Sequence, residues 1–160
     1  MAVEPPYHAA QEVISTIMRA LITGINGFVG GHLAERLLES GSWDVAGLGR
    51  QARLALPALQ ENVAYITADL ASLDQTIAAM DSARPDVIFH LAGQANVPRS
   101  FADPQATIEA NVGAQLNLFL ALLRRRDDPL VVIASSNEIY GHVLPGDLPL
   151  TEQTPLHPVN

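Results

Sequence analysis

A run of small and apolar residues near the start of the chain, LITGINGFVGGHLAERLL, constrains the fold more than any other segment. It begins as a short apolar strand, passes through Gly24, Gly27 and Gly30, and continues with the apolar periodicity of a helix. In this context the first glycine permits a tight turn, the second lets backbone approach a pyrophosphate, and the third lets the helix pack closely on the strand. The segment therefore predicts a strand, a phosphate-binding loop and a helix.

The same loop carries the residues that would meet a phosphate group. Asn26 lies within it, and the N–H groups of Phe28 and Val29 follow at the positive end of the helix dipole. A turn with a purely structural purpose is the alternative interpretation. We favour nucleotide binding, because a strand before the glycines and a helix after them is the context that this motif requires.

Short apolar runs alternate with segments of helical periodicity from residue 18 onward. This alternation is typical of βαβ units, in which helices cover both faces of a parallel sheet. We therefore expect one α/β domain over residues 18–160, built on a Rossmann-type doubly wound parallel sheet. The expected strands are 19–23, 43–48, 63–67, 86–92 and 130–135, and the expected helices run from Phe28 to Gly41, from Ser72 to Pro85 and from Asp103 to Arg126.

All three expected helices have a clear apolar stripe, which in a globular domain normally faces the core, and in the helix from Ser72 it consists of Leu73, Ile77 and Met80. In the first helix the stripe contains Val29, Leu33 and Leu37, with Gly30, Ala34 and Leu38 beside it. Arginines 124–126 end the last helix, where cations complement the helix dipole, and we interpret them as a solvated helix end. The stripe of that last helix consists of Ile108, Val112, Gln115, Leu116, Phe119, Leu122 and Leu123.

The end of the second expected strand bears on which dinucleotide would bind. An acidic residue there would hold a ribose 2′-hydroxyl, whereas an arginine suits a 2′-phosphate. Here the strand runs into Arg50, and Asp44 lies at its other end. The sequence therefore favours NADP with Arg50 as the partner of the 2′-phosphate, with NAD as the alternative. A solvated loop cation is the other interpretation of Arg50.

The third and fourth expected strands also end in candidate cofactor residues. Asp69 and Leu70 follow the third strand, where the carboxylate would accept a hydrogen bond from the adenine amino group or, alternatively, belong to the loop before the next helix. We interpret His90 as a buried, hydrogen-bonded histidine rather than a base. The next three residues, Leu91, Ala92 and Gly93, would let backbone approach the cofactor, since two of them are small.

The fifth expected strand ends in ASSNEIYG, beside the crevice expected for the cofactor. A hydroxyl at Ser136 would hydrogen-bond a substrate carbonyl or alkoxide, although this serine is equally well placed to cap a turn. Glu138 would serve as a general base if burial raised its pKa. Both are candidate catalytic residues.

Composition excludes several classes of partner. The net charge of −8 and a pI near 4.9 argue against binding nucleic acid or an anionic membrane through a broad basic surface. The absence of cysteine excludes disulfides and fits a cytoplasmic protein. No apolar run reaches the roughly 18 residues of a transmembrane helix. Residues 1–17 lack the pattern of an export signal, and we expect them to be a poorly ordered extension.

Taken in order, these segments resemble the extended short-chain dehydrogenase/reductase family, the NAD-dependent epimerases, dehydratases and reductases of nucleotide sugars. TGINGFVG resembles its cofactor loop, ADL its adenine contact, HLAGQANV its fourth-strand motif and SSNEIYG its active-site strand end. The resemblance covers residues 19–159 and places the catalytic serine at Ser136. Tyr140 matches a strand-end tyrosine of the family that is not the catalytic one.

The family's catalytic tyrosine and lysine belong to a YxxxK motif that follows a segment like LTEQTPLHPVN. That motif is absent from these 160 residues. The resemblance therefore implies a partial domain that stops before the catalytic helix and the substrate-binding region, and we expect this chain alone to bind cofactor weakly at most and to be inactive.

Within the family, the segment from SSNEIYG to the end is most similar to GDP-4-dehydro-6-deoxy-mannose reductases and then to GDP-mannose 4,6-dehydratases. The resemblance implies a nucleotide-sugar substrate, hydride transfer from NADPH to a C4 ketone, and a homodimer that pairs through the helix from Asp103 to Arg126. In a dehydratase, Glu138 would also remove the C5 proton. A non-catalytic NADP(H)-binding sensor is the alternative of another class, because the glycine loop alone needs no YxxxK motif.

Overall fold

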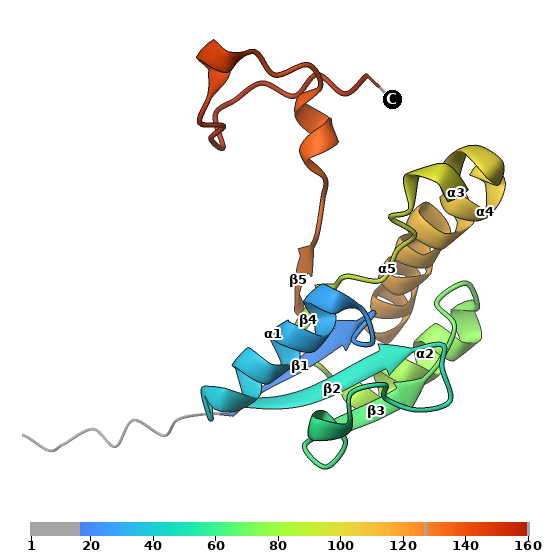
Figure 1. Cartoon of the computed structure of the whole chain (residues 1–160). Coiled ribbons are helices and arrows are strands. Elements are labelled where there is room, and N and C mark those ends of the chain that lie inside the picture. Colours follow the sequence, from blue (N-terminus) through green and yellow to red (C-terminus); the bar gives the residue numbers. More distant parts are fainter. Residues whose placement is uncertain (1–16, 127, 160) are drawn as a thin grey trace, which may run out of the picture.

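Five parallel strands form one sheet, in the order β3-β2-β1-β4-β5 (Figure 1). The structure, a computed structural model, describes residues 17–126 and 128–159, so the expected extension over residues 1–17 lies almost entirely outside it. The predicted doubly wound α/β fold is confirmed. The strands are β1 (Met18–Thr23), β2 (Trp43–Gly49), β3 (Val63–Thr67), β4 (Val87–His90) and β5 (Leu130–Ile133).

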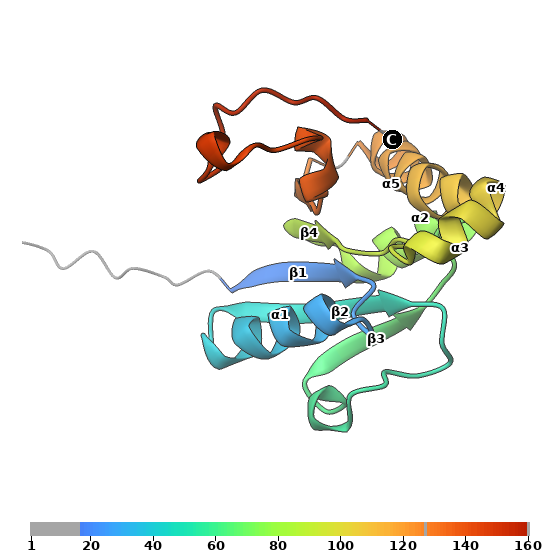
Figure 2. The ribbon, with the colours of Figure 1, turned by 45° about the horizontal axis from the view of Figure 1, so that its top comes forward.

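Helices cover the two faces of the sheet, and alternate residues of a strand enter different cores. Helix α1 (Phe28–Glu39) lies on one face, and α2 (Leu73–Ala83) and α5 (Ala114–Arg125) lie on the other (Figure 2). Leu21 of β1 belongs to the core with α2 and α5, whereas Ile22 packs in the core with α1. This alternation, with apolar residues on both faces, explains why the strands are nearly continuous in apolar residues.

The helix ends follow the local chemistry expected of them. The Ser72 side chain accepts a hydrogen bond from the Gln75 amide at the start of α2, and Asp103 accepts one from the Ala106 amide. Each side chain satisfies an amide that has no partner within the helix. Gly41 follows the last turn of α1 at a φ of +68°, a conformation that glycine adopts without strain.

The helix expected from Asp103 is interrupted by a wider turn. It consists of α4 (Pro104–Ile108), a π-helical turn at Glu109–Gly113 and then α5. A short helix that the periodicity did not predict, α3 (Val97–Ala102), precedes it and is capped by the side chain of Asn96. Turns of the π type are rare and occur often at functional sites.

The predicted inward stripes of the two long helices are confirmed only in part. In α1, Val29 is 60% exposed, while Gly30 and Ala34 are buried. Leu33 and Leu37 of the α1 stripe pack against the core that contains Ile22, so only the start of this stripe lies outside. On α4, the π turn and α5 the exposed residues are Ile108, Val112, Leu116 and Leu123, and the buried ones are Ala114, Leu118, Ala121 and Leu122.

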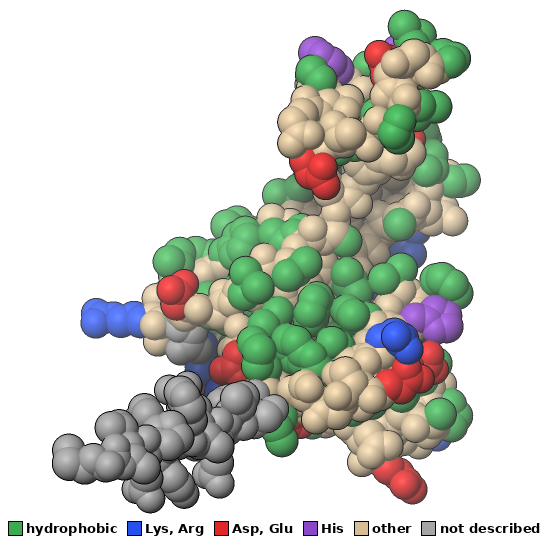
Figure 3. All heavy atoms as spheres, turned by 90° about the vertical axis from the view of Figure 1, so that its left-hand side faces the viewer, with side chains coloured by type: hydrophobic (Ala, Val, Ile, Leu, Met, Phe, Trp, Pro, Cys, Tyr) green, Lys and Arg blue, Asp and Glu red, His purple; other side chains and the backbone are tan. Residues whose placement is uncertain are grey.

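Residues 134–159 leave the sheet after β5 and stand apart from it (Figure 1). This segment contains two short 3₁₀ turns, at Asn137–Tyr140 and Pro145–Asp147, and folds back on itself where the His157 amide donates to the Ile139 carbonyl at 2.9 Å. The edge strand is poorly covered, since Leu130 is 64% exposed. Hydrophobic side chains gather on the body of the molecule beneath this segment (Figure 3).

Candidate cofactor site

The carboxyl ends of all five strands lie along one edge of the sheet. In the strand register Thr23 is level with both Leu48 and His90, and His90 is level with Ile133. Strand order reverses at β1, since the chain moves outward through β2 and β3 and then returns to place β4 on the other side. Ligands of open parallel sheets bind at such a switch point, and the glycine loop begins there.

The glycines of this loop have the local geometry that a dinucleotide cradle requires. Gly24 has a φ of +75°, and a side chain there would put its Cβ 2.9 Å from the Ala92 amide nitrogen at the end of β4. A Cβ at Gly30 would lie 2.7 Å from the Ile25 Cα, so this glycine allows close packing of α1 on the loop. A Cβ at Gly27 would meet only the Gly24 carbonyl, at 3.1 Å. Gly24 thus makes the predicted tight turn, Gly30 lets α1 pack on the loop rather than on the strand, and the assignments of both glycines as cofactor residues remain predictions.

The start of α1 is free to receive an anion. Its N-cap is Gly27, which supplies no capping side chain, and the first turn contains no acidic residue. The amides of Phe28 and Val29 donate to no acceptor among the described residues, and both side chains are exposed. Amides without partners at the positive end of a helix dipole suit a pyrophosphate. The assignments of these two residues and of Gly27 as cofactor ligands remain predictions.

The loop after β2 lies against the glycine loop. The Asn26 side chain accepts a hydrogen bond from the Ala55 amide at 2.8 Å and donates toward Gln51, Arg53 and Tyr65. Asn26 was predicted to bind cofactor, and the structure shows its side chain facing this loop. Sequence reasoning missed Tyr65, whose pKa is raised by burial.

Arg50 is the first residue after β2 and is exposed at the carboxyl edge of the sheet. Asp44 lies near the other end of β2, opposite Arg19 of β1, as predicted. Asp44 is therefore not at the carboxyl end of β2, where an acidic residue would hold a ribose 2′-hydroxyl. The assignment of Arg50 to a 2′-phosphate stays a prediction.

The loop after β3 is held by helix α5. The Asn117 side chain donates to the carbonyl oxygens of Leu70 and Ala71, at 2.8 and 3.0 Å. Asp69 accepts a hydrogen bond from the Ala71 amide, as in an Asx turn. Its carboxylate therefore has a local structural partner, and its predicted contact with adenine remains a prediction, as does that of Leu70.

The loop after β4 is held by the π turn. Asn111 accepts a hydrogen bond from the Gln94 amide at 2.6 Å and donates to the Gln94 carbonyl at 3.1 Å. A Cβ at Gly93 would lie 3.1 Å from the Asn111 amide oxygen, so the small residue permits this contact. Leu91, Ala92 and Gly93 are thereby held at the carboxyl edge, and their cofactor contacts remain predictions. Sequence reasoning did not identify Asn111.

His90 is buried beneath the site and hydrogen-bonded, as predicted. Its Nδ1 lies 2.9 Å from the Thr23 hydroxyl oxygen, which also accepts from the Ala92 amide at 3.2 Å. The Thr23 hydroxyl thus links the ring of His90 to the backbone of the loop after β4. Burial lowers the pKa of His90, because it disfavours the charged imidazolium.

This shift predicts a pH-dependent stability. The unfolded chain takes up a proton at His90 near the usual pKa of about 6.5, whereas the folded chain does so only at lower pH. The free energy of unfolding should therefore fall as pH decreases below about 6.5, by up to roughly 1.4 kcal/mol per pH unit. Urea unfolding at several pH values measures this slope.

A His90→Asn variant should show a flatter slope, because the group that takes up the proton is gone. A His32→Asn variant is the matched control, because that histidine is on the surface of α1. An equal slope in wild type and His90→Asn would show that another group is responsible.

The predicted catalytic residues follow β5 but lie on the segment that stands apart from the sheet. The Ser136 hydroxyl oxygen accepts a hydrogen bond from the Glu138 amide at 3.2 Å and caps the 3₁₀ turn. Both residues are exposed. The turn-capping interpretation of Ser136 is thus confirmed, and the catalytic assignments of both residues remain predictions.

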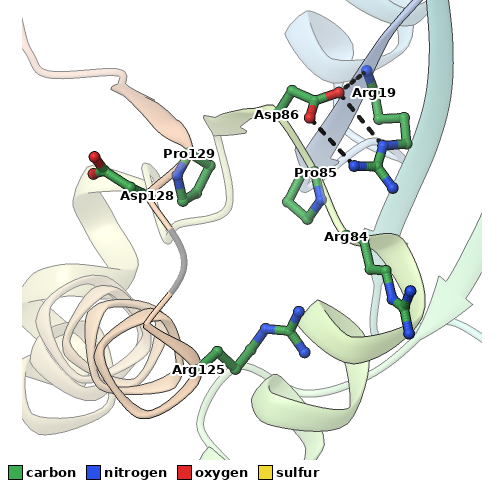
Figure 4. Close-up of a pocket in the computed structure, with 7 residues that line it drawn as sticks. All are labelled: Arg19, Arg84, Pro85, Asp86, Arg125, Asp128 and Pro129. Atoms are coloured by element: carbon green, nitrogen blue, oxygen red, sulfur yellow. Dashed lines mark hydrogen bonds and ion pairs between the residues drawn. The ribbon is translucent and has the colours of Figure 1, made fainter.

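A hollow of about 550 Å³ lies at the opposite, amino-terminal edge of the sheet (Figure 4). Arg19 donates to Asp86 there through its amide at 2.8 Å and its guanidinium at 3.2 Å, which lowers the pKa of Asp86. Arg125 points into the hollow and pairs with Asp81 of α2. The hollow is therefore separate from the glycine loop. Within the described residues no cluster of potential metal ligands occurs.

Comparison with known proteins agrees with this geometry. Residues 20–160 match the model of the NAD dependent epimerase/dehydratase family. The chain is 32% identical over 143 residues to the GDP-6-deoxy-D-mannose reductase of Pseudomonas aeruginosa, covering 89% of this chain and 41% of that protein.

Two solved structures resemble it as well. The UDP-glucose 4-epimerase of Thermus thermophilus in complex with NAD has a TM-score of 0.77 at 33% identity, covering 88% of this chain and 45% of that one. RMD from Pseudomonas aeruginosa complexed with NADPH has a TM-score of 0.66 at 32% identity, covering 88% and 42%. The chain thus spans less than half the length of these relatives. It belongs to the NAD-dependent epimerase/dehydratase family, the extended short-chain dehydrogenases/reductases.

Proposed function

We propose that the protein is an NADPH-dependent nucleotide-sugar oxidoreductase that reduces the C4 ketone of GDP-4-dehydro-6-deoxy-D-mannose. The observation that carries the proposal is the glycine loop at the switch point of the sheet, with uncapped amides at the start of α1. The similarity to the Pseudomonas aeruginosa reductase and to the structure of RMD with NADPH supports the choice of substrate and cofactor.

In this proposal each loop of the carboxyl edge binds one part of the cofactor, whose nicotinamide supplies the hydride. The amides of Phe28 and Val29 bind the pyrophosphate, and Arg50 binds the 2′-phosphate. Asp69 and Leu70 bind the adenine. The backbone of residues 91–93 lines the side toward the nicotinamide, where small side chains leave room.

Ser136 acts on the substrate. Its oxygen already accepts from the Glu138 amide, so the hydroxyl proton is available to donate to the C4 oxygen of the sugar. This hydrogen bond strengthens as negative charge develops on that oxygen during hydride transfer. In the balanced reaction a hydride from NADPH and a proton convert the ketone to a secondary alcohol.

An assay of the full gene product tests the proposal. NADPH absorbance should fall when GDP-4-dehydro-6-deoxy-D-mannose is added, and a Ser136→Ala variant should be slower by about 100-fold or more. Turnover of GDP-mannose without NADPH consumption would instead identify a dehydratase, and interconversion of UDP-glucose and UDP-galactose would identify an epimerase.

A non-catalytic NADP(H) sensor is the second candidate. It is favoured by the position of Ser136 and Glu138, which are exposed on a segment that stands apart from the sheet (Figure 1). The coding sequence beyond Asn160 separates the two candidates. A tyrosine and a lysine four residues apart, within a few codons, support the enzyme, and their absence would leave the sensor.

We also propose that a second copy of the chain covers the exposed stripe on α4, the π turn and α5. Ile108, Val112, Leu116 and Leu123 are between 54% and 73% exposed and follow one another at helical spacing. The helix from Pro104 to Arg125 is long and apolar enough to cross a membrane by length and composition. The inner face of this helix, however, packs in the core of the domain. Pairing with the same stripe of a second copy would bury the outer face.

Substitution of Val112 by glutamate should convert a dimer into a monomer, because it places a charge in the centre of the stripe. Sedimentation equilibrium of wild type and variant measures the change. Leu144→Glu is the control, since this leucine is equally exposed but lies on the C-terminal segment. A monomeric wild type would contradict the proposal.

A further inference from the structure

The segment 50–55 after β2 is held by one side chain of the glycine loop. The amide group of Asn26 donates to the side chain of Gln51, to the Arg53 carbonyl at 3.3 Å and to the Tyr65 hydroxyl at 3.1 Å. Its carbonyl oxygen accepts from the Ala55 amide at 2.8 Å. Both ends of the side chain are therefore engaged with protein groups.

Tyr65 of β3 forms a further hydrogen bond to the same segment. Its hydroxyl donates to the Gln51 carbonyl at 3.0 Å while it accepts from Asn26. A Cβ at Gly49 would lie only 2.6 Å from this hydroxyl, so the glycine at the end of β2 leaves the room that the tyrosine needs. Gln51 is therefore held by hydrogen bonds to Asn26 and Tyr65, and Gly49 leaves space for the tyrosine.

Apolar contacts hold the rest of the loop after β2 in place. Leu54 is 3% exposed and belongs to the core with α1. Leu56 occupies the space beside Gly31, where a Cβ would lie 2.6 Å from its Cδ1 atom. The segment is therefore packed against the start of α1, and its two arginines, Arg50 and Arg53, remain exposed.

We propose that Asn26 is a positioning residue that fixes the segment 50–55 against the glycine loop and thereby sets the preference for a cofactor with a 2′-phosphate. The inference rests on the proposed function, in which Arg50 binds that phosphate. Cations held in place before binding lose less conformational freedom when the phosphate arrives. NAD has no 2′-phosphate, so its affinity depends less on whether the segment 50–55 is held in one conformation.

Fluorescence titration of NADPH and NADH against wild type and Asn26→Ala tests the inference on the cofactor. The affinity for NADPH should fall about tenfold in the variant, and that for NADH by much less. Tyr65→Phe should shift the ratio in the same direction, because it removes the tie to the Gln51 carbonyl. Asn62→Ala is the matched control, an exposed asparagine in the turn before β3.

Hydrogen exchange of the chain without cofactor gives an independent measurement. The Ala55 amide should exchange faster in Asn26→Ala, because it loses its acceptor, while strand amides of β1 keep their protection. An unchanged ratio of NADPH to NADH affinity in Asn26→Ala, with NADPH preference lost in Arg50→Ala, would overturn the inference and leave the proposed function intact. A wild type that binds NADH more tightly than NADPH would overturn both.

Discussion

Replacement of Gly30 by alanine is expected to destabilise the chain by roughly 2–4 kcal/mol, because the added methyl group meets backbone that cannot move aside. The new Cβ would lie 2.5 Å from the Gly24 carbonyl oxygen and 2.7 Å from the Ile25 Cα. Relief of this overlap requires α1 to move away from the loop that precedes it. Urea unfolding followed by circular dichroism measures the loss, and cofactor affinity should fall with it.

Gly113→Ala is the matched control. This glycine lies at the end of the π turn with helical backbone angles, and nothing lies within 4 Å of a Cβ built there. Alanine should leave stability unchanged or raise it by about 0.5–1 kcal/mol, since it restricts the unfolded chain. Equal stability of the two variants would show that the start of α1 is not packed as described.

The second large effect is expected for the cofactor. Removal of the Arg50 side chain should weaken NADP binding by roughly 10- to 100-fold, because a charge-assisted pair with a phosphate is lost. NAD affinity should change little, since NAD carries no 2′-phosphate. Isothermal titration of both cofactors against wild type and Arg50→Ala measures the difference.

Arg36→Ala serves as the control for charge, because Arg36 is exposed on α1 and pairs with Glu39. It should leave both affinities near wild type. An equal loss of NAD and NADP affinity in Arg50→Ala would refute the assignment of this arginine to the 2′-phosphate.

The parts of the fold that depend on local chemistry were predictable from sequence. Gly24, Ser72 and Asp103 mark a turn and two helix starts through interactions with residues a few positions away. The alternation of apolar runs and helical segments then predicts parallel strands and their shared carboxyl edge. The positions of the cofactor loops along that edge follow from the same pattern.

Contacts between distant segments were not predictable in this way. The inward face of α5 is formed by Ala114, Leu118, Ala121 and Leu122, of which only Leu122 belongs to the predicted stripe. Asn26 meets Ala55 across 29 positions of the chain. Periodicity describes one element at a time and contains no information on such partners.

The π turn contacts the loop after β4 on its inner side and contributes to the exposed apolar stripe on its outer side. Asn111 points inward and holds Gln94 in the loop after β4, while the adjacent Val112 is 63% exposed on the outer stripe. The two residues share one turn of backbone, so a displacement of that turn moves both. In the proposed dimer, a contact at Val112 would therefore lie one residue away from the side chain that holds the loop after β4.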